Sequence, residues 1–226
     1  LNNRADFYET QGNYDEALKD YATAIEISTD SFGTARAINN RAMIYEDQEK
    51  YDLSIEEFTK ALTFLEHPII YTQRAGVYMN SEDYEKALED FTSAIDLDKE
   101  NPERYDNRAD CYIAMEKYTD ALKDFDKAIE LAPKNPYYYN NRADFYKTQE
   151  NYDEALQDYA KAIEISTDED QTSRAINNRA LIYEKQEKHE LAIEEYSKAI
   201  AIQPDYPLYY SNRAIIYESL EDYEKA

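Results

Sequence analysis

Apolar residues recur three, four and seven positions apart along the whole chain. This spacing places them on one face of an α-helix, whereas a half-buried strand requires strict alternation of apolar and polar residues. Two stretches with helical spacing follow each other in every segment and are separated by a short polar turn, as at residues 148–151. The pattern predicts a series of helical hairpins, each with a first and a second helix.

The dipeptide Arg-Ala shows that these hairpins are copies of one unit. In each segment one copy, preceded by asparagine or glutamine, begins at residue 4, 41, 74, 108, 142, 179 or 213 and thus recurs every 33 to 37 residues. A period of this length is typical of solenoid proteins. We therefore expect a single array over residues 1–226, with repeats at about 1–34, 35–67, 68–101, 102–135, 136–172, 173–206 and a truncated repeat at 207–226. Because both ends fall inside a repeat, we expect a fragment of a longer chain.

The repeats share fixed residue types when the arginine is numbered as position 7. Positions 8 and 27 are alanine, position 20 is alanine or serine, position 11 is tyrosine and position 24 is aromatic. Small side chains allow two helices to cross closely while aromatic rings fill the space beside the crossing. Asn13 and Asn151 precede second helices and are followed three residues later by glutamate, which predicts a capping box at each site.

This pattern resembles the tetratricopeptide repeat family, and the resemblance covers the whole chain. The chain is an Asn-Arg-Ala variant, because arginine stands at position 7, where the family usually has a packing leucine. The resemblance implies an all-α fold, a right-handed α-solenoid of helix-turn-helix repeats. It also implies a concave groove that is lined by the first helices and holds a peptide.

An acid at position 23 accompanies the arginine at position 7 in every repeat that extends that far. Seven guanidinium groups in a column suggest a site for carboxylates. The matched column of acids instead favours an ion pair between the two helices of each hairpin. We predict the internal ion pairs.

Position 6 carries an amide side chain in all seven repeats: Asn3, Asn40, Gln73, Asn107, Asn141, Asn178 and Asn212. An amide donates and accepts hydrogen bonds, so it pairs well with a peptide backbone. The resemblance implies this role, because family members hold the ligand main chain with asparagine here. A hydrogen bond between neighbouring repeats is an equally good interpretation, and both stay open.

The remaining groove positions are predominantly acidic. Positions 2, 5, 9, 12 and 13 carry ten acids, including Glu46, Asp110 and Asp144, and four bases; Ile113 and Tyr137 add apolar surface. The formal charge of the chain is −24. Such a surface favours a basic or amphipathic protein or peptide as partner and repels nucleic acid. The leading hypothesis is a scaffold that binds a partner peptide in the groove.

Neither catalytic chemistry nor a cofactor is expected. The two histidines lie far apart, no glycine-rich phosphate loop is present, and Cys111 stands at a core position. No apolar run is long enough to span a membrane. The location is left open, with the cytoplasm favoured. Two alternatives to the scaffold remain: a spacer or self-associating module that stacks end to end, and regulatory repeats of a larger enzyme.

A second level of repetition is present. Residues 2–62 and 140–200 align without a gap, with about 45 of 61 positions identical. A four-repeat block has therefore been duplicated. Recent gene duplication without functional meaning is the favoured interpretation, and a ligand with matching repetition is the alternative.

Overall fold

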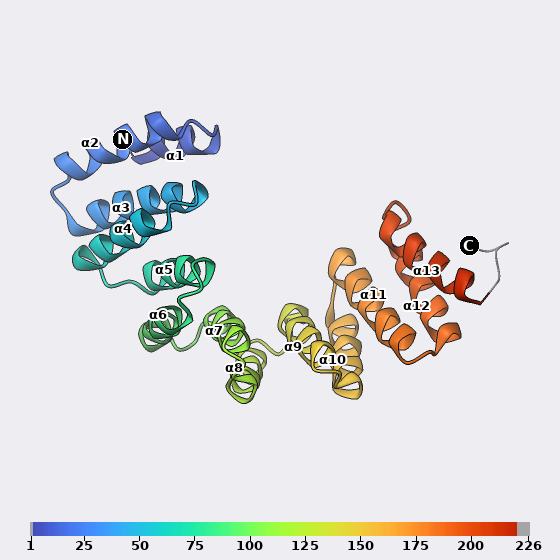
Figure 1. Cartoon of the computed structure of the whole chain (residues 1–226). Helices are drawn as coiled ribbons and strands as arrows, with labels where there is room; N and C mark the ends of the chain where they lie inside the picture. Colours follow the sequence, from blue (N-terminus) through green and yellow to red (C-terminus); the bar gives the residue numbers. More distant parts are fainter. Residues whose placement is uncertain (1, 221–226) are drawn as a thin grey trace. The chain divides into compact units, whose positions relative to one another are not determined.

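The computed structural model describes residues 2–220, which form thirteen α-helices and no strand (Figure 1). The all-α solenoid class predicted from the pattern is confirmed. The chain divides into two compact units, residues 1–124 and 125–226, and the division falls within α8 (Tyr118–Leu131). The expected single array over residues 1–226 stays a prediction.

The first unit contains three complete hairpins and a seventh helix. Its first helices are α1 (Asn2–Thr10), α3 (Ser31–Asp47), α5 (Pro68–Asn80) and α7 (Pro102–Ala114), and its second helices are α2 (Tyr14–Ile27), α4 (Tyr51–Phe64) and α6 (Tyr84–Leu97). Each helix packs against its neighbours in sequence, and α1 also contacts α3. First helices therefore lie beside first helices.

The second unit repeats this arrangement. Its first helices are α9 (Pro136–Thr148), α11 (Glu169–Lys185) and α13 (Pro207–Ser219), and its second helices are α10 (Tyr152–Ile165) and α12 (His189–Ile202). Here α9 contacts α11 in addition to α10. First helices thus lie beside first helices in this unit as well.

The alanine columns form the closest helix contacts, as predicted. Ala17, Ala61 and Ala143 are completely buried, and the position-24 rings of Tyr21 and Phe58 fill the space beside them. Cys111 is also buried, and its burial raises the pKa of the thiol to about 11. The predicted core assignment of Cys111 is confirmed.

The turn inside each hairpin requires a left-handed residue. Gly12 has φ 71°, and the same turn position is occupied by glutamate in the next five repeats, for example Glu49 and Glu150 with φ 56° and 58°. In the turn after α3, the Glu49 amide donates to the Glu46 carbonyl and the Lys50 amide to the Tyr45 carbonyl. These are the bonds of a Schellman motif, and the motif fixes where the second helix starts.

One local expectation was wrong. Asn13 and Asn151 occupy N-cap positions, yet neither side chain makes a capping hydrogen bond with its helix. Two repeats are three residues longer than the others, and the extra residues fall at 28–34 and 166–172. They begin α3 and α11 early, since Asp30 and Asp168 accept hydrogen bonds from the amides of Gly33 and Gln171.

Candidate functional site

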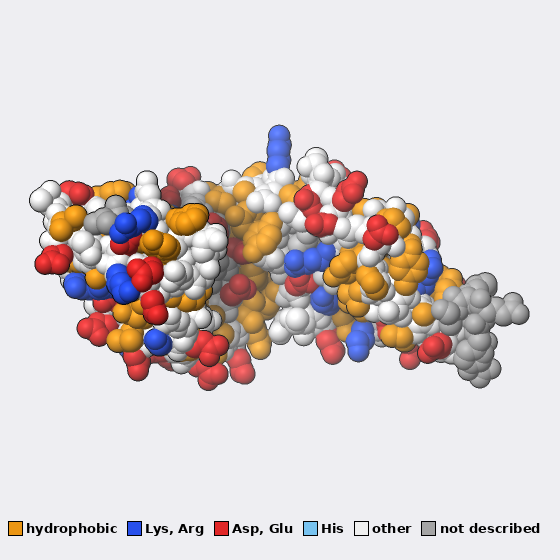
Figure 2. Space-filling model, turned by 90° about the horizontal axis from the view of Figure 1, so that it is seen from above, with side chains coloured by type: hydrophobic (Ala, Val, Ile, Leu, Met, Phe, Trp, Pro, Cys, Tyr) orange, Lys and Arg blue, Asp and Glu red, His pale blue; other side chains and the backbone are white. Residues whose placement is uncertain are grey.

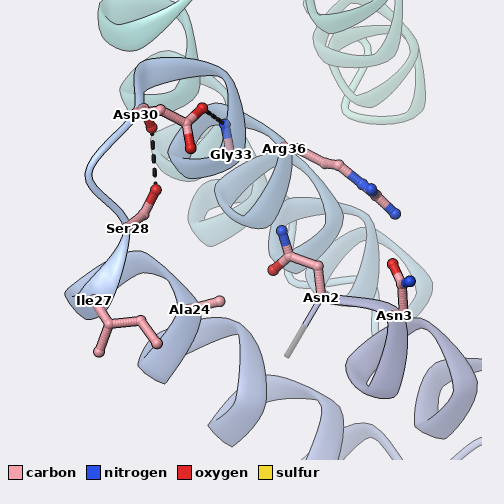
Figure 3. A pocket seen from close by; sticks show the side chains of 8 residues that line it. All are labelled: Asn2, Asn3, Ala24, Ile27, Ser28, Asp30, Gly33 and Arg36. Carbon is pink, nitrogen blue, oxygen red and sulfur yellow. Dashed lines mark hydrogen bonds between the residues drawn. The ribbon is translucent and has the colours of Figure 1, made fainter.

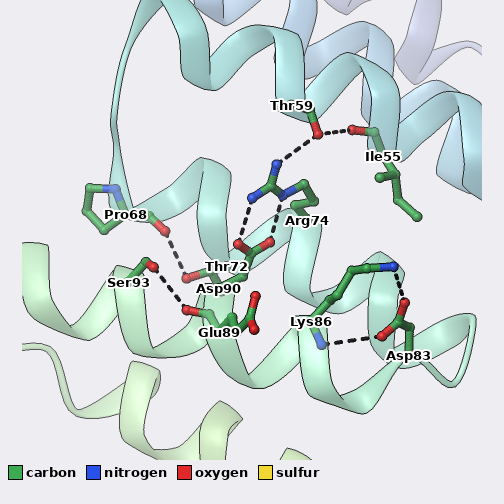
Figure 4. A network of polar contacts seen from close by, with 10 residues as sticks. All are labelled: Ile55, Thr59, Pro68, Thr72, Arg74, Asp83, Lys86, Glu89, Asp90 and Ser93. Carbon is green, nitrogen blue, oxygen red and sulfur yellow. Dashed lines mark hydrogen bonds and ion pairs between the residues drawn. The ribbon is translucent and has the colours of Figure 1, made fainter.

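The arginine column pairs with the acid column, as predicted. Arg74 donates two parallel hydrogen bonds to the carboxylate of Asp90, each 2.7 Å long (Figure 4). The equivalent pairs are Arg4–Asp20, Arg41–Glu57, Arg108–Asp124, Arg142–Asp158 and Arg179–Glu195, with N–O distances of 2.5, 2.5, 2.7, 2.7 and 3.4 Å. Six of the seven guanidinium groups are therefore paired within their hairpins, although Nε of Arg179 and Oε2 of Glu195 make no hydrogen bond with any described residue. This supports the internal ion pairs over a carboxylate-binding column.

The third guanidinium nitrogen, Nη1, forms hydrogen bonds that connect consecutive repeats. Nη1 of Arg74 donates to the Thr59 hydroxyl of the preceding second helix at 2.8 Å (Figure 4). Arg108 binds Thr92 and Arg213 binds Ser197 in the same way, and Arg142 reaches Asp126. Sequence reasoning missed these contacts. Their only signal is that position 25 is polar in four of the six repeats that contain it.

Burial of these ion pairs differs between the start of the chain and its interior. The Arg4 side chain is 60 % exposed, whereas that of Arg142, its counterpart in the second copy, is 20 % exposed. The difference follows from the preceding second helix, which contacts Arg142 but has no counterpart beside Arg4 among the described residues. The same ion pair is thus solvated in one copy and half-desolvated in the other.

The position-6 amide of the second repeat binds the preceding repeat. Nδ2 of Asn40 donates to Oδ1 of Asp6 at 3.0 Å, and the Tyr21 hydroxyl donates to the same oxygen at 2.5 Å. Arg36 donates to the other Asp6 oxygen at 2.7 Å. Burial raises the pKa of the Tyr21 hydroxyl well above its usual value, and the carboxyl groups of Asp6 and Glu9 beside it add to this effect.

The second copy reproduces this network. Nδ2 of Asn178 donates to Asp144 at 2.9 Å, the Tyr159 hydroxyl donates to Asp144, and Arg174 contributes an ion pair at 3.2 Å. Lys147 adds a further ion pair with Asp144 at 2.9 Å. Asn40, Asn178 and Asp144 therefore hold neighbouring repeats together, which is the second of the two interpretations left open for the amides.

The other amides have different surroundings. Nε2 of Gln73 lies 3.1 Å from the Met43 sulfur, and Nδ2 of Asn212 donates to Asn177 at 3.1 Å. Asn141 is half-buried on α9. Asn3 and Asn107 are the two that make no hydrogen bond within the part of the chain that the structure describes.

Asn107 is unpaired for a simple reason. Position 6 of one repeat contacts position 9 of the preceding repeat in the pairs Asn40–Asp6, Gln73–Met43 and Asn178–Asp144. The residue at position 9 before Asn107 is Gly76, which offers no side chain. A Cβ placed on Gly76 would meet no atom within 4 Å, so the space beside it is open. The half-buried Asn107 amide on α7 therefore faces a gap.

We define the first-helix face as the side chains at positions 2, 5, 6, 9, 12 and 13 of the first helices. In the first unit it carries seven acids and one base: Asp6, Glu9, Glu46, Asp47, Glu103, Asp106, Asp110 and Arg36. Of these acids Asp106 is buried, so it adds no exposed charge. In the second unit it carries three acids and three bases: Asp144, Glu184, Glu218, Lys147, Arg174 and Lys185. The whole acidic excess predicted from the sequence belongs to the first unit.

The electrostatics of the first unit reflect this crowding. Burial raises the pKa of Glu46, and the neighbouring Asp47 raises it further. Asp110 is an exposed residue, yet the protein around its carboxyl group displaces water and raises the pKa of that group. Carboxylates held in this way gain from a cationic group brought close to them.

The first-helix face also carries apolar side chains. On the surface seen in Figure 2, acidic (red) and hydrophobic (orange) side chains adjoin in several places. In the first unit Ile69 is 52 % exposed and Ile113 is half-buried. In the second unit Tyr137 is 44 % exposed, with its ring edge against Tyr138. The face therefore combines charge with exposed apolar surface in both units.

Pockets occur where a second helix meets the next first helix. One, of about 400 Å³, is lined by Asn2 and Asn3 of α1, Ile27 of α2 and Arg36 of α3 (Figure 3). A second, of about 540 Å³, lies between α11 and α13 and includes Asn177 and Tyr209. A third, of about 130 Å³, lies at the equivalent place between α3 and α5 and includes Asn39 and Ile70.

The described residues contain no cluster of three or more His, Cys, Asp and Glu side chains suited to a metal ion. Within residues 2–220, no helix has both the length and the apolar character that crossing a membrane requires.

Comparison with known proteins agrees with the repeat pattern. Family models described as tetratricopeptide repeat match residues 1–67 and 136–205, residues 69–101 and residues 107–135. No curated protein sequence matches the chain.

Solved structures share the fold. A tetratricopeptide repeat protein from Parabacteroides merdae is 23 % identical, with a TM-score of 0.73 over 99 % of this chain and 86 % of its own. Pseudomonas aeruginosa pilF is 20 % identical, with a TM-score of 0.68 over 97 % and 94 %. YrrB, titled a TPR protein with an unusual peptide-binding site, is 24 % identical, with a TM-score of 0.58 over 85 % and 96 %. From the repeat register, the helical hairpins and the family models together, we conclude that the chain belongs to the tetratricopeptide repeat family.

Proposed function

We propose that this chain is a non-catalytic protein-interaction module that holds a peptide segment of a partner protein on the first-helix face of its first unit. The observation that carries the proposal is the unpaired amide of Asn107 beside the open space at Gly76. An amide that donates and accepts at once suits the main chain of a peptide, whatever its sequence. Tetratricopeptide hairpins support a role in protein binding, and YrrB is described as having a peptide-binding site.

The chemistry around Asn107 favours a basic or amphipathic peptide. Seven acids and one base lie on the first-helix face of this unit, and Glu46 and Asp110 have raised pKa values. Ile69, Met79 and Ile113 offer apolar contacts on the same face. Exposed charges attract and orient such a ligand, while the apolar contacts and the amide fix its register.

Gly76 provides the sharpest test. Gly76→Asp places a carboxylate where Asp6 and Asp144 bind their amides, so it should occupy Asn107 internally and block the peptide. Gly76→Ala adds a methyl group to open space and leaves the amide free. We expect Asn107→Ala and Gly76→Asp each to weaken binding of a peptide selected from a library at least about tenfold, which corresponds to about 1.4 kcal/mol. Gly76→Ala should bind like the wild type.

Stability measurements provide the control. Asn107→Ala should leave the free energy of unfolding within about 0.5 kcal/mol of the wild type, because the amide has no internal partner. Asn40→Ala should lower it by about 1.5–3 kcal/mol, because Asn40 donates to the charged Asp6. Unchanged peptide binding by Asn107→Ala would refute the proposed site.

A further inference from the structure

The two copies of the duplicated block differ in charge at one place on the first-helix face. Glu9 and Asp47 in the first copy correspond to Lys147 and Lys185 in the second. These are the two acid-to-lysine differences between the aligned segments, and both fall at the C-terminal ends of adjacent first helices. The flanking residues Tyr14 and Tyr152 are the same.

In the second copy these residues surround a pocket of about 300 Å³, which we call the lysine pocket. Tyr152, Leu181 and Ile182 form its apolar wall, and Lys147, Lys185 and Glu150 supply its charges. Lys147 is already paired with Asp144. Lys185 is exposed and makes no ion pair within residues 2–220, so its ammonium group is available.

In the first copy the same place, which we call the acidic counterpart, is formed by Glu9, Tyr14, Met43 and Asp47. The Tyr14 hydroxyl lies 3.3 Å from Asp47, and the hydroxyl oxygen of Tyr21 lies 2.9 Å from a carboxyl oxygen of Glu9. Burial raises the pKa of Glu9, and the charges of Asp6 and Asp47 add to that effect. No lysine or arginine is paired with Glu9 or Asp47 in the described chain, so the charge there is uncompensated.

We infer that the two copies bind peptide segments of opposite charge: the lysine pocket takes an apolar side chain flanked by carboxylates, and the acidic counterpart takes one flanked by ammonium groups. The wall is apolar in both copies, with Tyr152 and Leu181 matched by Tyr14 and Met43, so it gives affinity without discriminating between charges. The lysines and acids decide which charge is accepted. This inference rests on the proposed function, because it assumes that the first-helix face binds peptides.

The copies themselves supply the test variants. Lys147→Glu with Lys185→Asp gives the second copy the residues of the first, and Glu9→Lys with Asp47→Lys gives the first copy the residues of the second. Each substitution places a residue that already occurs at that place in a folded copy, and thermal unfolding followed by circular dichroism checks that both variants fold.

The probes are the acetylated pentapeptides Ala-Glu-Leu-Glu-Ala and Ala-Lys-Leu-Lys-Ala, with a photoreactive leucine analogue at the centre, tested on the whole chain. In the wild type we expect the acidic probe to cross-link to residues 147–185 and the basic probe to residues 9–47. The first double variant should lower the affinity for the acidic probe at least about tenfold. The second double variant should move acidic-probe cross-links into residues 9–47.

Two results would overturn the inference. One is cross-linking of both probes to the same copy, and the other is unchanged affinity of the acidic probe after the lysines are replaced. If the basic probe still binds the first unit in an Asn107-dependent way, such a result leaves the proposed function intact. If neither probe binds and no library peptide binds either, the proposed function fails together with the inference.

Discussion

Residues 2–62 and 140–200 show which parts of a repeat tolerate change. The contacts between helices are the same in both copies: Asp6 and Asp144 each receive an asparagine, a tyrosine and an arginine from the same positions. The differences lie on the first-helix face and at the junction with the following repeat. The duplicated framework is therefore retained while the surface has changed its charge.

The junction between each copy and the repeat that follows it differs in chemistry. In the first copy Ala35, Leu65 and Ile70 pack as an apolar seam between α3 and α5. In the second copy Ser173, Gln203 and Tyr209 stand at these positions and hydrogen bond one another at 2.6, 3.1 and 3.2 Å. Three residues that differ between the copies thus replace apolar packing with side chains that hydrogen bond to one another.

The largest expected difference between the copies concerns the ion pair at positions 7 and 23. Asp158→Ala leaves the Arg142 guanidinium half-desolvated, and we expect a loss of about 3 kcal/mol, the lower end for a broken buried pair because Asp126 still contacts the arginine. Asp20→Ala should cost much less, because water reaches the Arg4 side chain freely. Urea unfolding of both variants measures the difference. Equal losses would show that exposure does not control the strength of this pair.

The junction gives the next largest effect. Leu65→Gln buries an amide beside Ala35 and Ile70, which offer no partner, and should lower the free energy of unfolding by about 1–3 kcal/mol. Adding Ala35→Ser and Ile70→Tyr recreates the bonds seen around Gln203 and should recover part of this loss. Urea titrations of the single and triple variants report the coupling. Strictly additive losses would contradict the network.

The turn at position 15 differs by one residue between the copies. Glu150 adopts φ 58°, where a residue with a Cβ is disfavoured, while its counterpart Gly12 has φ 71°. We expect Glu150→Gly to stabilise the chain by about 1 kcal/mol and Gly12→Glu to destabilise it by a similar amount. Thermal unfolding midpoints test both changes, and a stabilising Gly12→Glu would be inconsistent with this account.

The smallest expected effect is a dependence on pH caused by Glu9, whose counterpart in the second copy is Lys147. Burial raises the pKa of Glu9, with the Tyr21 hydroxyl opposing and Asp6 reinforcing the change. Glu9 therefore binds its proton more tightly in the folded chain than in the unfolded chain. Its contribution to the free energy of unfolding is fully present below the pKa of Glu9 in the unfolded chain and is lost as the pH rises through its pKa in the folded chain.

Glu9→Gln should accordingly be more favourable relative to the wild type at pH 7 than at pH 4, by no more than about 0.5 kcal/mol. Chemical unfolding at the two pH values measures this trend. Lys147→Gln is the matched control, because it removes no carboxyl group, and an equal trend in that variant would exclude Glu9 as the cause.

The sequence alone determined the hairpins, the repeat register and the ion pairs. Each is set by residues at fixed spacing. Small side chains at positions 8, 20 and 27 bring helices together. Arg74 pairs with Asp90 across one hairpin because positions 7 and 23 lie the same distance apart in every repeat. The register also named the amides of position 6. It did not distinguish them, because an asparagine has the same pattern whether it binds a neighbour or a ligand.

Only the tertiary structure made that distinction. Asn40 and Asn107 occupy the same position in the register, yet Asn40 donates to Asp6 while Asn107 faces the open space at Gly76. The partner belongs to the preceding repeat, about one period away in sequence, so its contribution emerges only when the first helices are stacked. Likewise, the sequence predicted one acidic face along the whole chain. The division into two units showed that this net negative charge belongs to the first unit, whereas acids and bases are balanced in the second. A hydrogen bond depends on the distance and direction between two groups, and the fold alone supplies both.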